Sequence, residues 1–234
     1  PRMLDHYLGL IPGLDHEDVH RRLIPVSVGD WTQRPLTQKI LERPRLLRRL
    51  RSLIGEPAQA VILPFVTTQL EARLAIELGV PIYGADPRLE AIGSKTGSRE
   101  AFASAGVPHP RGAAGVHTVS DVVEVVARLR SGPNPPDGVV VKHDVGVSGG
   151  GNAMVDLRDA ESGDRADLAA RVQCLRPEDP DLDVEAYLEQ LDREGGVVEE
   201  RIVGEDFCSP SVQLRASPEG GIEVLTTHDQ VLGG

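Results

Sequence analysis

The spacing of apolar residues in the first part of the chain predicts helices and strands in alternation. Residues 44–55, PRLLRRLRSLIG, carry Leu and Ile at helical spacing between a proline that suits a first turn and a glycine that suits a stop. An apolar strand is predicted over 60–64, then a helix ending at Gly79, then a second strand over 80–83. A strand, a helix and a strand within about thirty residues form a βαβ unit with parallel strands. A β-branched run closed by a glycine predicts a further strand within 20–29.

Later in the chain the pattern changes to amphipathic helices, short strands and turns. The cap-like sequence TVSD at 118–121 precedes a valine-rich helix that stops near Gly132. The other predicted elements are a helix over 88–106, a loop over 132–138, strands over 139–142 and 153–157, one helix (183–194) within 156–196, and a hairpin with arms 196–214 and 222–228. Because parallel βαβ gives way to mixed hairpins near residue 95, we place a domain boundary there. The fold class is therefore α/β at the start and α+β in the second half.

Composition narrows the classes of protein to which the chain can belong. Its 234 residues suffice for one large or two modest domains, and aromatic residues are only 3%, so Val, Leu, Ile and Ala must fill the interior. The formal charge of -11, without a large basic tract, argues against duplex nucleic acid or an anionic membrane as the main partner. No apolar run approaches ~18 residues, so no membrane span is expected.

The cysteines and the chain ends add two expectations. Cys174 and Cys208 form neither a CxxC pair nor a metal-ligand cluster, which fits a reducing, cytoplasmic setting with both thiols buried as small hydrophobes. The sequence starts at Pro1 without an initiator methionine and stops at Gly234 directly after a strand-like run. We therefore expect it to be a piece of a longer protein.

Residues 139–152, VVVKHDVGVSGGGN, carry the first candidate chemistry. Lys142 stands at the end of a strand, which fixes an ammonium better than a loop could and suits it to phosphate oxygens. The glycines that follow let backbone amides approach a phosphate and adopt positive φ. No GK[ST] follows and no helix opens after the glycines, so the stretch is neither a P-loop nor a dinucleotide-binding turn. Taken alone, it is equally typical of an ordinary hairpin with a loose tip.

Two more segments indicate a binding site only when they are considered together with Lys142. Lys95 precedes a helix and a Gly-Val-Pro connector, a place where a single lysine is usually just exposed. Residues 197–207, VVEERIVGEDF, offer backbone groups for an adenine edge and, a few residues on, a carboxylate for ribose hydroxyls. An edge hairpin with outward-facing acids explains the same pattern.

In order and spacing, these elements resemble the ATP-grasp superfamily of carboxylate–amine ligases. The matching features are a lysine before the small central domain (SK, 94–95), a strand lysine followed by a glycine flap (VVVK to GGGN), and an E-x-x-I-x-G-x-acid hinge from Glu199 or Glu200 to Asp206. The strings LPFVTTQLEA, YGADP, SKTGSR, GGGN, SPSVQ and HDQVLGG look more narrowly like the peptide ligases of pheganomycin-type biosynthesis. Each motif is weak by itself, but the ordered set is specific, and it covers roughly residues 55–234.

The resemblance implies an organisation and a reaction. A pre-ATP-grasp α/β domain would span 1–94, a small ATP-grasp subdomain with the flap 95–196, and the hinge with the truncated start of the large subdomain 197–234. Enzymes of this family transfer the γ-phosphoryl of ATP to a carboxylate, and an amine then attacks the acyl phosphate. Positioning and charge neutralisation carry such a reaction more than covalent catalysis does. The implied partners are ATP and small-molecule or peptide acids and amines, without nucleic acid or membrane, and a homodimer stays open.

The resemblance also assigns roles to residues. Lys142 and Lys95 would be catalytic and contact the α- and β-phosphates, and amides of 148–151 would cover the β- and γ-phosphates. Backbone at 198–202 would hold adenine, with Asp206 or its neighbour Glu205 at the ribose. The implied nucleotide-binding residues are Lys95, Lys142, Ser148, Gly149, Gly150, Gly151, Asn152, Glu199, Glu200, Arg201, Ile202, Glu205 and Asp206.

The metal of this family is the point at which the sequence departs from the pattern. The family binds Mg²⁺ through an acid and a Glu-x-Asn-type pair on later strands, so we expect the ligands beyond Gly234 and assign none here. His228 and Asp229 could face the same cleft, although the capped end of a strand is their commoner role. These residues alone are therefore not expected to turn over, while ATP binding could survive.

Two other functions stay open at this point. The missing metal residues also fit a catalytically inactive nucleotide-binding or scaffold protein with a degenerate ATP-grasp fold. The βαβ half, taken alone, suggests a dinucleotide-binding oxidoreductase, but no GxGxxG turn follows its strands.

Overall fold

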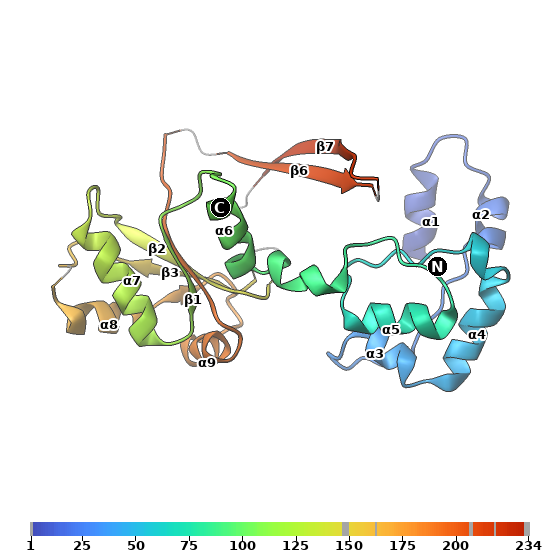
Figure 1. The fold of residues 1–234 in the computed structure, drawn as a ribbon, viewed down its shortest axis with the longest axis horizontal. Helices are drawn as coiled ribbons and strands as arrows, with labels where there is room; N and C mark the ends of the chain where they lie inside the picture. The colour runs from blue at the N-terminus through green and yellow to red at the C-terminus, as the bar shows by residue number, and fades with distance from the viewer. Residues whose placement is uncertain (1, 147–149, 162, 206–207, 218, 232–234) are drawn as a thin grey trace. The chain divides into compact units, whose positions relative to one another are not determined.

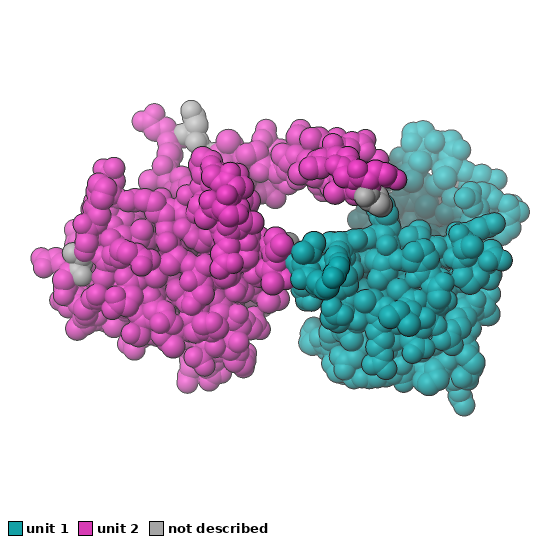
Figure 2. Space-filling model, viewed as in Figure 1, with its two compact units in different colours: residues 1–90 teal, residues 91–234 magenta. Residues whose placement is uncertain are grey.

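A computed structural model describes residues 2–146, 150–161, 163–205, 208–217 and 219–231, and the chain divides into two compact units (Figures 1 and 2). Unit 1 is Pro1–Glu90 and unit 2 is Ala91–Gly234, so the division lies close to the boundary expected near residue 95. Each unit has its own cluster of buried apolar side chains. The finer division of residues 95–234 at position 197 stays a prediction.

Unit 1 is mainly helical. Its elements are α1 (Arg2–Gly9), α2 (His16–Arg22), α3 (Leu36–Leu41), α4 (Pro44–Ile54) and α5 (Gln69–Leu78), with the 3₁₀ turns η1 (Pro57–Gln59) and η2 (Pro87–Gly93), the last of which continues into unit 2. The core lies where α3, α4 and α5 meet and contains Leu47, Leu74, Leu78 and Val80. The predicted helix over 44–55 is confirmed, with Pro44 in its first turn and Gly55 after its last residue.

The predicted βαβ unit is present but much reduced. A single parallel bridge joins Ile62 to Ile82, through Ile62 N–H to Pro81 O at 2.8 Å and Tyr83 N–H to Ile62 O at 2.8 Å. Pro64 and Pro81 have no N–H to donate, which limits how far the ladder can extend. Among the described residues of unit 1, strands 60–64 and 80–83 are thus reduced to this bridge, while the helix between them, α5, is confirmed.

The strand predicted within 20–29 is wrong. Residues up to Arg22 belong to α2, which Asp15 caps by accepting hydrogen bonds from the amides of Glu17 and Asp18. Residues 23–31 have no regular structure. Pro25 lacks an amide hydrogen and Gly29 has φ of +63°, so a β-branched run here has neither the donors nor the backbone of a strand.

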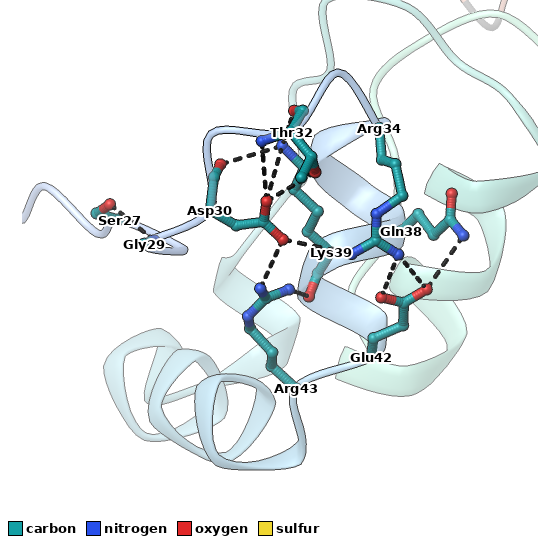
Figure 3. Close-up of polar contacts among 9 residues, drawn as sticks. All are labelled: Ser27, Gly29, Asp30, Thr32, Arg34, Gln38, Lys39, Glu42 and Arg43. Carbon is teal, nitrogen blue, oxygen red and sulfur yellow. Dashed lines mark hydrogen bonds and ion pairs between the residues drawn. The ribbon is translucent and has the colours of Figure 1, made fainter.

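A cluster of charged side chains fixes the segment that follows (Figure 3). The Asp30 carboxylate accepts hydrogen bonds from the Thr32 amide (3.0 Å), the Thr32 hydroxyl (2.7 Å) and the Arg43 guanidinium (2.7 Å). Lys39, buried at 6% exposure, donates to the backbone carbonyls of Asp30 (3.1 Å) and Thr32 (2.6 Å). The Thr32 hydrogen bonds, followed by Arg43, hold the pKa of Asp30 well below its ordinary value.

Asp30→Asn should lower the midpoint of thermal unfolding of unit 1 by a few degrees, because the amide cannot keep the charged contacts with Arg43 and Lys39. A carboxyl group with a depressed pKa stabilises the fold above its unfolded pKa. The difference between wild type and variant should therefore be constant from pH 5 to 8 and shrink below about pH 4. Melting curves across this range check the result, with the exposed Glu90→Gln as the matched control. A difference that grew on acidification would contradict it.

Unit 2 is built on a five-stranded antiparallel sheet (Figure 1). The strands are β1 (Gly112–Val116), β2 (Gly138–His143), β3 (Asn152–Asp156), β4 (Arg176–Pro177) and β5 (Gly196–Glu200), in the spatial order β1-β5-β2-β3-β4. Strand β5 is therefore an inner strand of this sheet, paired with both β1 and β2. The strands predicted over 139–142 and 153–157 are confirmed as β2 and β3.

Four helices accompany the sheet, namely α6 (Lys95–Ser104), α7 (Val119–Ser131), α8 (Arg165–Gln173) and α9 (Val184–Glu194). Buried residues of α7, α8 and α9, such as Val126, Leu168 and Leu191, pack with Val139 and Val141 of β2 in one core. The α6 helix contacts β1 and β5. The predicted cap of α7 is confirmed as a capping box between Thr118 and Asp121.

Several details of unit 2 differ from expectation. The helix predicted over 88–106 is two helices, because the Ser94 side chain caps α6 and interrupts the run from η2. The helix α8 was not predicted; its short buried pair Leu168 and Val172, four residues apart, gives only a weak periodic signal. Both cysteines are exposed, so their predicted burial is wrong: Cys174 follows the last residue of α8, Cys208 precedes β6, and both lie outside the core.

The final hairpin is also shorter than predicted. It consists of the antiparallel strands β6 (Ser209–Ala216) and β7 (Ile222–Gln230). Residues 196–200, expected in its first arm, pair instead in the five-stranded sheet, because their buried valines fit between β1 and β2.

Candidate nucleotide site

Lys142 lies on the side of β2 that faces away from the main core. Strand alternation turns Val141 into the core and Lys142 to the opposite face. Its ammonium lies 2.7 Å from Glu199 Oε2 on β5, and the other oxygen of that carboxylate accepts from Arg99 of α6 at 2.8 Å. The side chains of Lys142, Glu199 and Arg99 are 29%, 14% and 11% exposed. The three together carry one net positive charge in a half-buried place.

Lys95 brings a second ammonium to the same place. It is the first residue of α6, which Ser94 caps, and its Nζ donates to the carbonyl oxygen of His143 at 2.7 Å. Burial lowers the pKa of Lys95, and the positive charge of Lys142 lowers it further, against the opposing effect of Asp144 and Glu199. The two lysines are thus electrostatic neighbours, and a phosphate between them would relieve their repulsion.

The described ends of the glycine loop between β2 and β3 lie close to each other, and Gly146 lies close to Lys95. A Cβ placed on Gly146 would lie 2.3 Å from Gly150 O and 3.4 Å from Lys95 Nζ, so only glycine permits this approach. Gly151 has φ of +90°, which also favours glycine. Asp144 ties the start of the loop to α6, since its Oδ1 accepts from the Thr96 amide at 2.9 Å.

Not all predicted site residues lie in this place. Ser148, Gly149 and Asp206 lie outside the described residues. Asn152 pairs with Lys142 across β2 and β3, but its side-chain amide donates to Glu178 at 3.0 Å. Arg201, Ile202 and Glu205 follow the end of β5 and are exposed.

The two predicted acids of the hinge are already paired within the chain. Glu199 lies between Lys142 and Arg99, and Glu200 accepts from Arg111 through Nε at 2.7 Å and through the backbone amide at 2.8 Å. The Arg111 side chain holds the pKa of Glu200 below its ordinary value. Arg111 also donates to the carbonyl oxygens of Pro133 and Asn134, so the Arg111–Glu200 pair links the end of β5 to the segment that follows α7.

Sequence reasoning missed Arg99, His143 and Tyr187. Arg99 follows Lys95 by four residues, so both lie on one face of α6, a spacing that becomes readable only once Ser94 is known to start the helix. The composition held no signal for these three residues, but it held one for the two lysines of the site.

The chain has 25 basic residues but only three lysines, Lys39, Lys95 and Lys142, and the last two are the lysines of the candidate site.

The described residues contain no group of three or more His, Cys, Asp or Glu placed to hold a metal ion. Across the same described ranges, no helix combines the length and the apolar character needed to cross a membrane.

Comparison with known proteins shows what the chain is similar to. Residues 5–80 match the model of the pre ATP-grasp domain. A curated protein of Streptantibioticus cattleyicolor, L-propargylglycine--L-glutamate ligase, is 30% identical over 241 residues, which is 100% of this chain and 48% of that protein. IQ motif-containing protein H of Danio rerio is 27% identical over 250 residues, 90% of this chain and 23% of that protein. The chain thus spans about half, or less, of the length of these relatives.

Among solved structures, D-alanyl-alanine synthetase A from Vibrio cholerae matches 74% of this chain and 46% of its own, with a TM-score of 0.48 and 13% identity, values too low to carry an argument. The domain match places residues 5–80 in the pre ATP-grasp domain family. Along its whole length the chain is similar to about half of L-propargylglycine--L-glutamate ligase.

Proposed function

We propose that this protein is an ATP-dependent ligase that joins a carboxylate to an amine and releases ADP. The single observation that carries the proposal is the meeting of Lys95, Lys142 and Gly146 at one face of the sheet. Two ammonium groups and approachable backbone amides form a donor set that fits a polyphosphate. The relative from Streptantibioticus cattleyicolor is named for joining two amino acids, and we propose amino acids as substrates here too.

In the proposed reaction, an oxygen of the carboxylate attacks the γ-phosphorus of ATP, and the bond to the bridging oxygen breaks to release ADP. The amine nitrogen then attacks the acyl carbon, the carbon–oxygen bond to phosphate breaks, and the nitrogen loses a proton. Lys95 and Lys142 neutralise charge on the phosphate chain during the first step. Mg²⁺ would accompany the ATP, with its ligands outside the described residues.

The ion pairs of the site support binding of an anion by Lys142. Lys142 can exchange Glu199 for a phosphate oxygen without leaving that carboxylate uncompensated, because Arg99 still donates to its other oxygen. We further propose that the backbone at 198–202 holds adenine, that Glu205 or Asp206 holds the ribose, and that the protein works in the cytoplasm.

The protein should form ADP from ATP and Mg²⁺ only when a carboxylate and an amine, such as two amino acids, are both supplied. Hydroxylamine in place of the amine should trap the acyl phosphate as a hydroxamate. A coupled ADP assay with mass spectrometry of products checks both. Release of AMP in place of ADP would overturn the proposal, and ATP binding without ADP formation would favour a scaffold with a degenerate site.

The scarcity of lysine gives this experiment a matched control. Acetic anhydride labelling followed by peptide mass spectrometry reports on all three lysines. Bound ATP should protect Lys95 and Lys142 from acetylation and leave the buried Lys39 of unit 1 unchanged. Equal labelling of Lys95 and Lys142 with and without saturating ATP would contradict their role.

A further inference from the structure

Tyr187 of α9 ties together the two ends of the glycine loop. Its side chain is fully buried, and its hydroxyl lies 2.8 Å from the carbonyl oxygen of Val141 on β2 and 3.0 Å from that of Gly151, just before β3. The Gly151 carbonyl also accepts from the His143 amide at 2.8 Å. One phenol therefore joins the strand that enters the loop to the residue that leaves it.

His143 lies between this phenol and Lys95. Its ring stacks on the Tyr187 ring at 4.0 Å between centroids, and its Nε2 lies 3.0 Å from the Tyr187 carbonyl oxygen. Because a carbonyl only accepts, Nε2 carries the hydrogen in the neutral ring, and the buried Nδ1 has no partner among the described residues. The backbone oxygen of the same residue accepts the Lys95 ammonium at 2.7 Å.

Gly151 packs directly against this ring. A Cβ built on Gly151 would lie 3.2 Å from both Cβ and Nδ1 of His143. The contacts thus form one connected path: Tyr187 holds His143 and Gly151, His143 holds Lys95, and Lys142 follows Val141 along β2. Simple core filling does not need this arrangement, because Leu191, one turn later on α9, is equally buried without a polar group.

We infer that Tyr187 and His143 are positioning residues for the phosphate-binding groups. They touch no reacting atom themselves. Tyr187 sets the separation of β2 and the loop end, and the His143 backbone sets the direction of the Lys95 ammonium. Each buried hydrogen bond of this kind orders the site before a polyphosphate binds. Less binding free energy is then lost in ordering the phosphate-binding groups. This inference rests on the proposed nucleotide site.

Tyr187→Phe is the test, because it removes one hydroxyl and keeps the ring that stacks on His143. In calorimetric titrations with ATP, the dissociation constant should rise about fivefold, the loss expected for one buried hydrogen bond. The KM for ATP should rise by the same factor with the KM for the carboxylate unchanged. Tyr83→Phe, which alters an exposed phenol of unit 1, should change neither.

Hydrogen exchange gives a second readout that does not depend on ATP. In Tyr187→Phe, the His143 amide should exchange faster, because its acceptor Gly151 is no longer held, while the buried amide of Val126 in α7 should not. If this variant folds poorly, Gly151→Ala tests the same contact from the loop side. Unchanged ATP affinity and unchanged His143 exchange would overturn the inference. Wild-type protein that fails to bind ATP would overturn the proposed function. The hydrogen exchange of the His143 amide in Tyr187→Phe would still show whether Tyr187 positions the end of the loop.

Discussion

Replacing Lys142 by alanine should weaken ATP binding about 100-fold and remove measurable ADP formation. A charge-assisted hydrogen bond to phosphate is worth roughly 1.5–3 kcal/mol, and every ~1.4 kcal/mol is a factor of ten in affinity. The variant also loses one of the two cations that flank Glu199, whose carboxylate then faces an incoming phosphate with only Arg99 to offset it. Calorimetry and the ADP assay measure the two effects.

A double variant separates the two causes of this loss. Lys142→Ala with Glu199→Gln should bind ATP more tightly than Lys142→Ala alone. The double variant no longer has the Glu199 carboxylate to repel a phosphate, although it still lacks the Lys142 contact. Arg45→Ala removes an exposed cation from α4 in unit 1 and should leave affinity unchanged, which controls for net charge. An unaltered ATP affinity and turnover in Lys142→Ala would refute the role of this lysine.

Gly196→Ala should destabilise unit 2 by about 3 kcal/mol and weaken ATP binding together with it. Gly196 is the first residue of β5, and a Cβ there would lie 2.2 Å from Lys142 O and 2.9 Å from a methyl carbon of Leu191. Neither neighbour can give way cheaply, because one is backbone of the adjacent strand and the other is fully buried. The strands must separate at the residue that carries the ammonium.

Chemical denaturation followed by circular dichroism measures the loss of stability. Gly132→Ala is the matched control, since a Cβ there has its nearest neighbour, Leu129 O, at an ordinary 3.6 Å and the backbone φ of −85° suits alanine. It should stay within about 0.5 kcal/mol of wild type. Equal stabilities of the two variants would show that β2 and β5 can adjust at this point.

The parts of the fold that follow from local chemistry were predictable. Pro44 and Gly55 bound α4, and Thr118 with Asp121 starts α7, because caps and stops act over a few residues. Strands pair with partners that lie far away in the sequence, and the predictions of strand pairing were partly wrong. Residues 196–200 read as one arm of a hairpin, but their partners are β1 and β2, more than fifty residues earlier for β2. The run at 20–29 had the composition of a strand, but no described residue pairs with it as a strand.

The candidate site divides in the same way. Lys95, Lys142 and the glycines were readable because their residue types are unusual for their places in the pattern. Arg99 and Tyr187 were not, since an arginine on a helix and a tyrosine among apolar positions are ordinary until the fold shows what they touch. The acids Glu199 and Glu200 were noticed, but their pairing with Arg99, Lys142 and Arg111 depends on contacts across the sheet.

The strand order has a consequence for how the chain is made. In space β5 lies between β1 and β2, yet it is the last of the five strands to leave the ribosome. At the usual pace of translation, β1 waits several seconds with an open edge before its neighbour exists. Such non-local pairing slows folding and leaves unpaired backbone exposed meanwhile. Nascent chains that end before β5 should thus be the stage at which this protein most needs a chaperone.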